Sequence, residues 1–457
     1  MKQKAPPGRF AATLPKVGRD KLKPAGRLQA AIEILTDIEQ RHRPAGQALA
    51  DWGRGHRFAG SGDRAAIGNL VYDALRQRAS ITARMGEDSP RAQALGALAF
   101  AWGQSFETIG ALCDGSKFAP EPLSEAEQSG LNTALPQEAP SWLRGDYPEW
   151  LHPSLERAFQ QRAGEEGAGL SKRAPVDLRV NTLKANREKL LKSLEKFKPA
   201  QTALSPLGLR VAAPVGPGRS PHLEADTAHG RGWFEIQDEG SQLAALLSAS
   251  RPGMQVADIC AGSGGKTLCL AAMMENKGQI HAYDADAIRL RPIFERLKRA
   301  GARNVQVMRG GEEDALKTLA GKMDRVVIDA PCSGSGVWRR RPEAKWRLKP
   351  AQLERRLTEQ KDVLELGAGL VKPGGRLVYI TCSVLPEENG DQVTAFLQRQ
   401  PDFRLVPYRQ VWAEAMGSEP PGSADGSSDT LLLTPASHGT DGFFVAVMER
   451  IAPPLRT

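Results

Sequence analysis

Two cysteines occupy matching positions, each just beyond an apolar run that predicts a buried strand. Cys332 follows the run 325–329, and Cys382 follows the run 376–381, in a chain with only five cysteines. Open α/β sheets bind ligands beyond the carboxyl ends of their strands. A thiolate placed there can attack an electrophilic carbon, which is covalent catalysis. Either cysteine alone could equally be a small buried thiol, so the prediction of a catalytic role rests on the two together.

The run before the first cysteine ends in an acid, within Asp-Ala-Pro-Cys-Ser-Gly at 329–334. Asp329 can hydrogen-bond a pyrimidine edge or a ligand amine. Pro331 restricts the backbone, so that Cys332 projects in a set direction. The run 326–329 by itself also resembles a Walker B strand.

A glycine-rich loop separates another predicted strand from a helix at 257–267. Glycines permit positive φ, and a helix N-terminus offers free N–H groups. A Walker A loop would need glycine where Cys260 stands, and a dinucleotide fingerprint would need it at Thr267. S-adenosyl-L-methionine needs a tight glycine turn and an acid about twenty residues on for the ribose, which Asp284 supplies.

A basic run, Arg339, Arg340 and Arg341, lies shortly after the first cysteine. It could hold RNA phosphates beside the reaction centre, with Trp338 and Trp346 stacking on an unpaired base. The alternative is a solvated charged loop.

Strands and helices alternate from Phe234 onward, which predicts a parallel sheet with helices on both faces. The predicted strands are 254–259, 279–284, 304–308, 325–329, 376–381 and the pair 429–434 and 442–448. The predicted helices are 239–249, 266–275, 286–300, 350–371 and 386–399. In a doubly wound sheet the first strand lies beside the fourth and the fourth beside the fifth. Asp258, Cys332 and Cys382 should then lie along one edge.

Four regions are expected along the chain. A basic arm covers 1–25, a helical domain 26–145, a small α+β subdomain 146–233, and a Rossmann-like catalytic domain 234–452. The net charge of +9 favours a polyanionic partner.

No cysteine spacing predicts a metal site or a disulfide framework. No apolar run is long enough for a membrane span. We therefore expect a monomer in the cytoplasm, with no metal and no membrane contact.

Together these motifs resemble the RsmB/Sun-type (Nol–Nop–Sun) RNA cytosine-5 methyltransferases. The resemblance covers nearly the whole chain and is most specific at 234–390 and at Asp-Gly-Phe-Phe, 441–444. It implies a Rossmann-like methyltransferase fold that uses S-adenosyl-L-methionine, and a NusB-like helical RNA-binding domain. The cofactor contacts that the resemblance implies are Cys260, Ala261, Gly262, Ser263, Gly264, Gly265, Lys266, Asp284 and Asp329. Arg179 and Asn181 match a strand of the family's middle subdomain, where RNA contacts are expected. The family's loop usually has proline where this chain has Ser263.

The resemblance also implies the catalytic roles. Cys382 is expected to be the nucleophile and Cys332 to release the product, an order that residue chemistry alone leaves open. Asp329 would bond the cytosine ring at nitrogen 3, and Lys266 would hold the loop and carboxylate in place. The expected product is 5-methylcytidine in small-subunit ribosomal RNA. Alternatives are a tRNA cytosine-5 methyltransferase, a P-loop-like NTPase and a non-catalytic RNA-binding assembly factor.

Overall fold

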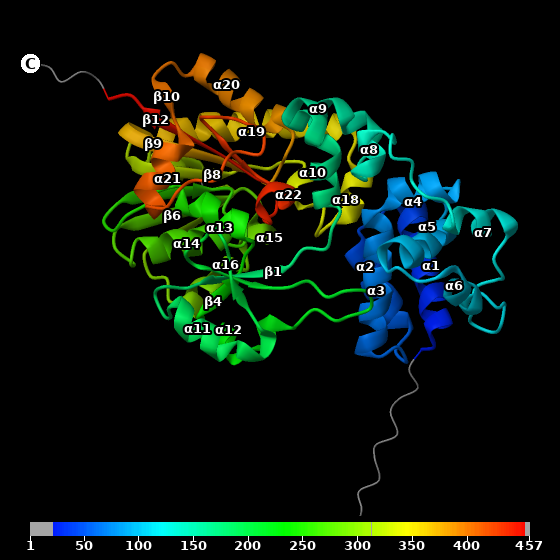
Figure 1. Ribbon diagram of the computed structural model, residues 1–457. Coiled ribbons are helices and arrows are strands. Elements are labelled where there is room, and N and C mark those ends of the chain that lie inside the picture. The colour runs from blue at the N-terminus through cyan, green and yellow to red at the C-terminus, as the bar shows by residue number, and fades with distance from the viewer. Residues whose placement is uncertain (1–21, 312, 453–457) are drawn as a thin grey trace, which may run out of the picture.

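The computed structural model describes residues 22–311 and 313–452, so most of the expected arm at 1–25 lies outside the described residues. Figure 1 shows a group of helices on one side, a large sheet with flanking helices on the other, and a small sheet beneath the large one. The first helix begins at Pro24, slightly earlier than the expected boundary.

The N-terminal region consists of helices that enclose their own core. On α1, Leu28, Ala31, Ile34, Leu35 and Ile38 recur every three or four residues and are buried on one face. The helices of this region are α1 (Pro24–Arg41), α2 (Ala45–Gly55), α3 (Ser61–Arg76), α4 (Arg78–Met85), α5 (Pro90–Gly96), α6 (Phe106–Leu112) and α7 (Glu125–Leu131).

The middle of the chain divides between two cores. Helices α8 (Ser141–Arg144), α9 (His152–Phe159) and α10 (Ala163–Leu170) bury Leu155 and Phe159 in the core of the large sheet. The small sheet has the antiparallel order β2-β3-β1-β4. Its elements are β1 (Val176–Val180), α11 (Arg187–Ser193), β2 (Ala200–Gln201), β3 (Gly208–Val211), α12 (Thr227–Gly230) and β4 (Phe234–Ile236). Because β4 pairs with β1, the small sheet extends to Ile236, three residues beyond the expected boundary at 233/234.

The large sheet has the order β10-β12-β9-β8-β5-β6-β7, with β11 paired to β12. The run from β9 to β7 is parallel, and β12 pairs antiparallel with both of its neighbours, β9 and β10. The expected neighbours, β5 beside β8 and β8 beside β9, are present, and the fold class is confirmed. The strands are β5 (Gln255–Ile259), β6 (Gln279–Asp284), β7 (Val305–Arg309), β8 (Met323–Asp329), β9 (Val371–Thr381), β10 (Phe403–Val406), β11 (Leu431–Leu433) and β12 (Phe443–Arg450).

Helices cover both faces of this sheet (Figure 1). Successive residues along a strand pack on opposite faces of the sheet. Val327 and Val378 lie in the core on one face, and Ile328 and Tyr379 lie in the core on the other. The helices are α13 (Glu239–Leu246), α14 (Gly265–Met273), α15 (Ala287–Leu290), α16 (Ile293–Ala300), α17 (Glu313–Lys317), α18 (Pro342–Arg347), α19 (Pro350–Leu370), α20 (Gly390–Arg399), α21 (Tyr408–Met416) and α22 (Pro435–His438). Among the described residues, no helix combines the length and apolar character needed to cross a membrane.

Candidate active site

The parallel pairing of β8 with β9 brings the two cysteines together. Asp329 is in register with Ile380, so both strands end at the same edge. The Sγ atoms of Cys332 and Cys382 are 3.4 Å apart, and both cysteines are free. Gly336 N–H also donates to the Cys382 carbonyl at 2.9 Å. Two thiols in contact at a sheet edge can both reach one bound substrate, one as a nucleophile and the other in proton transfer.

Serine hydroxyls tie the two cysteine loops to each other. The hydroxyls of Ser335 and Ser383 lie 2.9 Å apart. Val384 N–H donates across to Ser335 Oγ at 2.9 Å, while Leu385 N–H donates to Ser383 Oγ at 3.0 Å within the Cys382 loop. These bonds fix the relative position of the loops that carry the thiols.

The surroundings favour the protonated form of Cys332. Its hydrogen bond with Cys382, followed by burial and the nearby charge of Glu388, raises the pKa of the Cys332 thiol well above its usual value. Before any ligand binds, Cys332 is therefore a neutral thiol at neutral pH, able to donate to the neighbouring sulfur.

The glycine loop after β5 has the geometry expected of a cofactor turn. Gly262 and Gly264 have φ angles of 53° and 85°, a region that favours glycine. At Gly264 a Cβ would lie 2.5 Å from Ile293 Cγ1, so α16 closes over the turn only because that side chain is absent. The N-terminus of α14 follows at Gly265.

Asp284 stands at the end of β6, next to this loop. Its Oδ2 accepts from Gly262 N–H and its Oδ1 from Asp286 N–H, both at 2.8 Å. The side chain is buried, and each carboxylate oxygen retains acceptor capacity beyond its one backbone bond. A fixed acid against a left-handed glycine turn fits the ribose and amino-acid ends of S-adenosyl-L-methionine.

Asp258 lies under the loop, fully buried at the end of β5. Its Oδ2 accepts from the Thr267 hydroxyl at 2.5 Å, so it braces the start of α14. Burial raises the pKa of Asp258 to about 7.

An ion pair joins the cofactor loop to the thiol edge. Lys266 Nζ lies 2.7 Å from Asp329 Oδ2. The Lys266 side chain is 6% exposed while that of Asp329 is 37% exposed, so the carboxylate faces the open side of the site. Lys266 can thus hold Asp329 in place beside a bound base.

Ser263, which replaces the family's proline, has a defined partner. Arg296 of α16 donates to the Ser263 carbonyl at 2.9 Å and to its hydroxyl at 2.8 Å. Arg296 is itself paired with Glu235 of β4 at 2.9 Å. The small sheet therefore supports the cofactor loop in this chain.

The structure corrects the expected RNA contacts of the basic run. Arg339 is buried and pairs with Asp441, while Arg340 pairs with Asp441 and with Asp238 at 3.0 Å. Arg341 is exposed, and its expected contact stays a prediction. The two paired arginines instead tie the loop after Cys332 to the residues before β12 and α13.

The expected base-stacking role of two tryptophans is also wrong. Trp338 is buried in the core, and Trp346 donates its indole N–H to the Leu75 carbonyl at 2.6 Å. Both rings support packing between elements, and Trp346 is half-buried against the helical core.

Arg179 and Asn181 are likewise internal. Arg179 is 1% exposed and donates to the Gly265 carbonyl at 2.9 Å. Asn181 is buried and donates to the carbonyls of Gly232 and Ala300, both at 2.8 Å. These side chains position the small sheet against the cofactor loop, and their expected role as RNA contacts is wrong.

A different basic surface adjoins the thiols. A hollow of about 170 Å³ is lined by Cys332, Ser333 and the side chains Arg347, Arg355 and Arg356 from α18 and α19. Arg347 and Arg355 are exposed. Sequence reasoning did not reach Arg355 and Arg356, because these side chains join the thiol only through the placement of α19.

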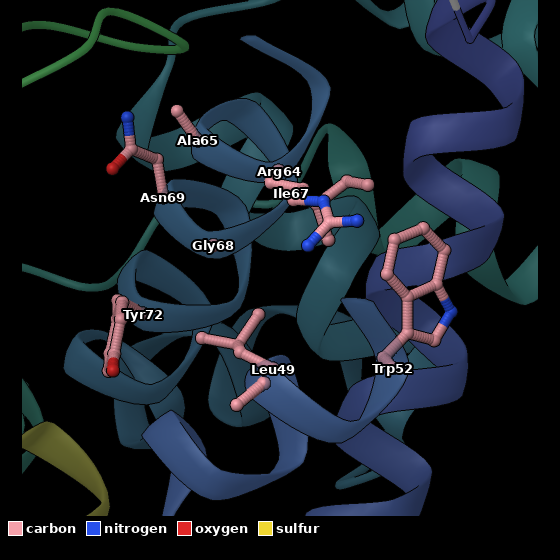
Figure 2. Close-up of a pocket in the computed structure, with 9 residues that line it drawn as sticks. Leu49, Trp52, Arg64, Ala65, Ile67, Gly68, Asn69 and Tyr72 are labelled. Atoms are coloured by element: carbon pink, nitrogen blue, oxygen red, sulfur yellow. The ribbon is translucent and has the colours of Figure 1, made fainter. Parts of the chain in front are cut away.

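Another hollow, of about 370 Å³, lies between α2 and α3 in the helical region. Figure 2 shows Asn69 and Tyr72 on one side of it and Trp52 and Arg64 on the other. Asn69 donates to the carbonyls of Gly216 and Gly218, at 3.1 and 2.7 Å. The hollow therefore adjoins a contact between regions and contains none of the reacting side chains.

Comparison with known proteins agrees with this geometry. A family model described as 16S rRNA methyltransferase RsmB/F matches residues 245–449, and one described as an RsmF/B-like ferredoxin-like domain matches 147–216. The chain is 31% identical over 329 residues to a probable ribosomal RNA small subunit methyltransferase B of Synechocystis sp., covering 71% of each. It is 33% identical over 323 residues to the ribosomal RNA small subunit methyltransferase B of Salmonella typhi, covering 70% of each.

Solved structures extend the similarity to nearly the whole chain. The crystal structure of PH0851 is 26% identical, with a TM-score of 0.70, covering 94% of this chain and 100% of its own. A methyltransferase homolog protein from Pyrococcus horikoshii is 28% identical, with a TM-score of 0.56, covering 70% and 100%. The chain belongs to the RsmB/F family of S-adenosyl-L-methionine-dependent 16S rRNA methyltransferases.

Proposed function

We propose that this enzyme forms 5-methylcytidine in small-subunit ribosomal RNA through a covalent cysteine–cytosine intermediate. The observation that carries the proposal is the thiol pair, 3.4 Å apart, beside the carboxylate of Asp329. Carbon 5 of cytosine is a poor nucleophile, and a thiol adding at carbon 6 activates it. A second thiol next to the first is suited to the later removal of a proton.

Each side chain has one task in this scheme. The Cys382 thiol gives its proton to solvent and bonds to carbon 6 as a thiolate, while Asp329 stabilises the developing charge through a proton that it shares with ring nitrogen 3. S-adenosyl-L-methionine, held by the glycine loop and Asp284, supplies the methyl group. Once Cys382 is bonded to the base, Cys332 gives its own proton to solvent, and the resulting thiolate takes the proton from carbon 5, directly or through water. The C–H electron pair restores the ring double bond, and Cys382 leaves as a thiolate.

The RNA strand would lie over the arginine-lined hollow beside Cys332. Arg347, Arg355 and Arg356 offer positive charge for phosphates next to the target nucleotide. Because a duplex hides the pyrimidine face, the target would be an unpaired or extruded cytidine.

The helical region 26–145 would add further RNA contacts as a NusB-like module, in a monomeric protein of the cytoplasm. The family membership and the absence of disulfides among the described cysteines support this view. Arg179, Asn181, Arg339 and Arg340 have no part in it.

The test is the Cys382→Ala variant. It should lose 5-methylcytidine formation on small-subunit ribosomal RNA, read by bisulfite sequencing, and keep its affinity for S-adenosyl-L-homocysteine. Cys113→Ala, a buried cysteine of the helical region, is the matched control. Activity of Cys382→Ala within tenfold of wild type would contradict the assignment. Methylation of tRNA in place of ribosomal RNA, or binding of ATP, would favour the alternative functions.

A further inference from the structure

A buried glutamate reaches from the element after one thiol to the loop of the other. Glu388 lies on the 3₁₀ turn between β9 and α20 and is fully buried. Its Oε1 accepts from the Ser333 backbone N–H at 2.7 Å, and its Oε2 accepts from the Ser333 hydroxyl at 2.5 Å. Ser333 directly follows Cys332, so the carboxyl group holds the backbone next to that thiol.

A second side chain holds the other flank of the same cysteine. Gln360 of α19 donates to the Pro331 carbonyl at 2.9 Å and to Glu388 Oε1 at 3.0 Å. Tyr379 of β9 donates to the Glu388 backbone carbonyl at 2.7 Å, which fixes the turn itself. Residues on both sides of Cys332 are therefore tied to one internal cluster.

Both oxygens of the Glu388 carboxyl group are hydrogen-bonded inside this cluster. Burying a carboxyl group is costly unless hydrogen bonds compensate. Here both oxygens accept hydrogen bonds from the Cys332 loop, and none of the side chain faces solvent. Burial raises the pKa of Glu388, and its bonds to Ser333 oppose that rise. The placement points to a role in the geometry of the loop.

We propose that Glu388 is a positioning residue that fixes Cys332 for product release, an inference that rests on the proposed function. Attack by Cys382 does not require Cys332 to be in place. Removal of the carbon 5 proton does, because the Cys332 sulfur must reach that proton, directly or through one water. A small misplacement of such a group costs roughly tenfold to a hundredfold in rate.

The experiment compares Glu388→Ala, Glu388→Gln and the control Glu387→Ala on denaturing gels with labelled RNA. Glu387 is the neighbouring acid and bonds to Ser154 and Arg157 of α9. Glu388→Ala should lower kcat at least about tenfold and accumulate a covalent protein–RNA adduct, with KM for RNA and cofactor affinity unchanged. Glu388→Gln keeps the size and an acceptor for Ser333 N–H, so it should restore most of the rate. Glu387→Ala should behave as wild type.

Three results would overturn the positioning role: no adduct from a folded Glu388→Ala protein, an adduct from Glu387→Ala as well, or a Glu388→Gln variant as defective as Glu388→Ala. If Glu388→Ala does not fold, Ser333→Ala removes one donor of the cluster and should give a weaker form of the same adduct, and its absence counts against the role. Cys332→Ala is run alongside. If it yields no adduct, the proposed chemistry fails. If it does and Glu388→Ala does not, only the role of Glu388 fails.

Discussion

Most of the chemistry that could be predicted from the sequence depends on residues near the strand ends. The contact between Cys332 and Cys382 and the ion pair between Lys266 and Asp329 follow from motifs at neighbouring strand ends. Charge alone misled at Arg339, because its partner Asp441 lies about a hundred residues away in sequence. A basic residue beside a catalytic motif can therefore either bind phosphate or pair with a buried acid, and only its long-range contacts show which.

The buried acid beneath the cofactor loop makes stability depend on pH. The pKa of Asp258 is about 7 in the folded protein, against about 3.9 for an unfolded chain. Between these values the folded state keeps a proton that the unfolded state has lost, so stability falls as pH rises through that window.

Asp258→Asn is neutral at every pH and lacks this fall. Its melting temperature relative to wild type should therefore be higher at pH 8 than at pH 5, by at least about 2 °C. Thermal unfolding at both pH values measures the offset, with the exposed Asp314→Asn as control. An equal offset at both pH values would show that Asp258 does not hold a proton in the folded state.

At the level of elements, local patterns located most helices and strands but not all of their boundaries. The expected helix 286–300 is split into α15 and α16 around Pro292, because proline lacks the N–H that a continuous helix needs. Strand β10 was missed, and β12 inserts between β9 and β10. Strand order at the sheet's edge depends on pairing between distant segments, which no local window contains.

Helices α18 and α19 are expected to bind RNA through their exposed arginines. The double variant Arg347→Gln/Arg355→Gln should raise KM for RNA and leave cofactor affinity unchanged. Loss of two phosphate contacts should flatten the salt dependence of log K by about 1.4. Titration of RNA binding against salt concentration measures this slope.

A matched control removes the same charge elsewhere on the catalytic region. Arg404 on β10 and Arg409 on α21 are both exposed, at the opposite edge of the sheet from β7. Arg404→Gln/Arg409→Gln should keep the wild-type slope. Equal flattening in both double variants would indicate a diffuse charge effect rather than a binding surface.

On the scale of the whole molecule, buried charges join the helical region to the rest. Asp73 on α3 accepts from Arg76 at 2.8 Å and from Arg173 Nε at 3.0 Å, and Arg76 donates to the Arg339 carbonyl. Lys345 is fully buried and donates to the Arg76 carbonyl at 2.7 Å. Local sequence patterns contain no sign of this interface, because its members lie far apart in the chain, at 73–76, 173 and 339–345.

Removing Asp73 should weaken this attachment. Asp73→Ala leaves the Arg76 and Arg173 side chains without their carboxylate, and breaking a buried pair in this way costs about 3–5 kcal/mol. Calorimetry should show a lower-temperature transition for the variant, while Asp51→Ala on the more exposed face of α2 should show little change. An unchanged unfolding profile for Asp73→Ala would mean that apolar packing alone holds the region in place.

The central claim is that Cys382 bonds to the base and Cys332 releases it. The most direct measurement is mass spectrometry of the Cys332→Ala protein after incubation with small-subunit RNA and S-adenosyl-L-methionine, followed by digestion of both chains. We predict a peptide containing Cys382 that carries a methylated cytidine. A nucleotide attached instead to Cys332 in the Cys382→Ala protein, with none attached to Cys382 in Cys332→Ala, would contradict the account.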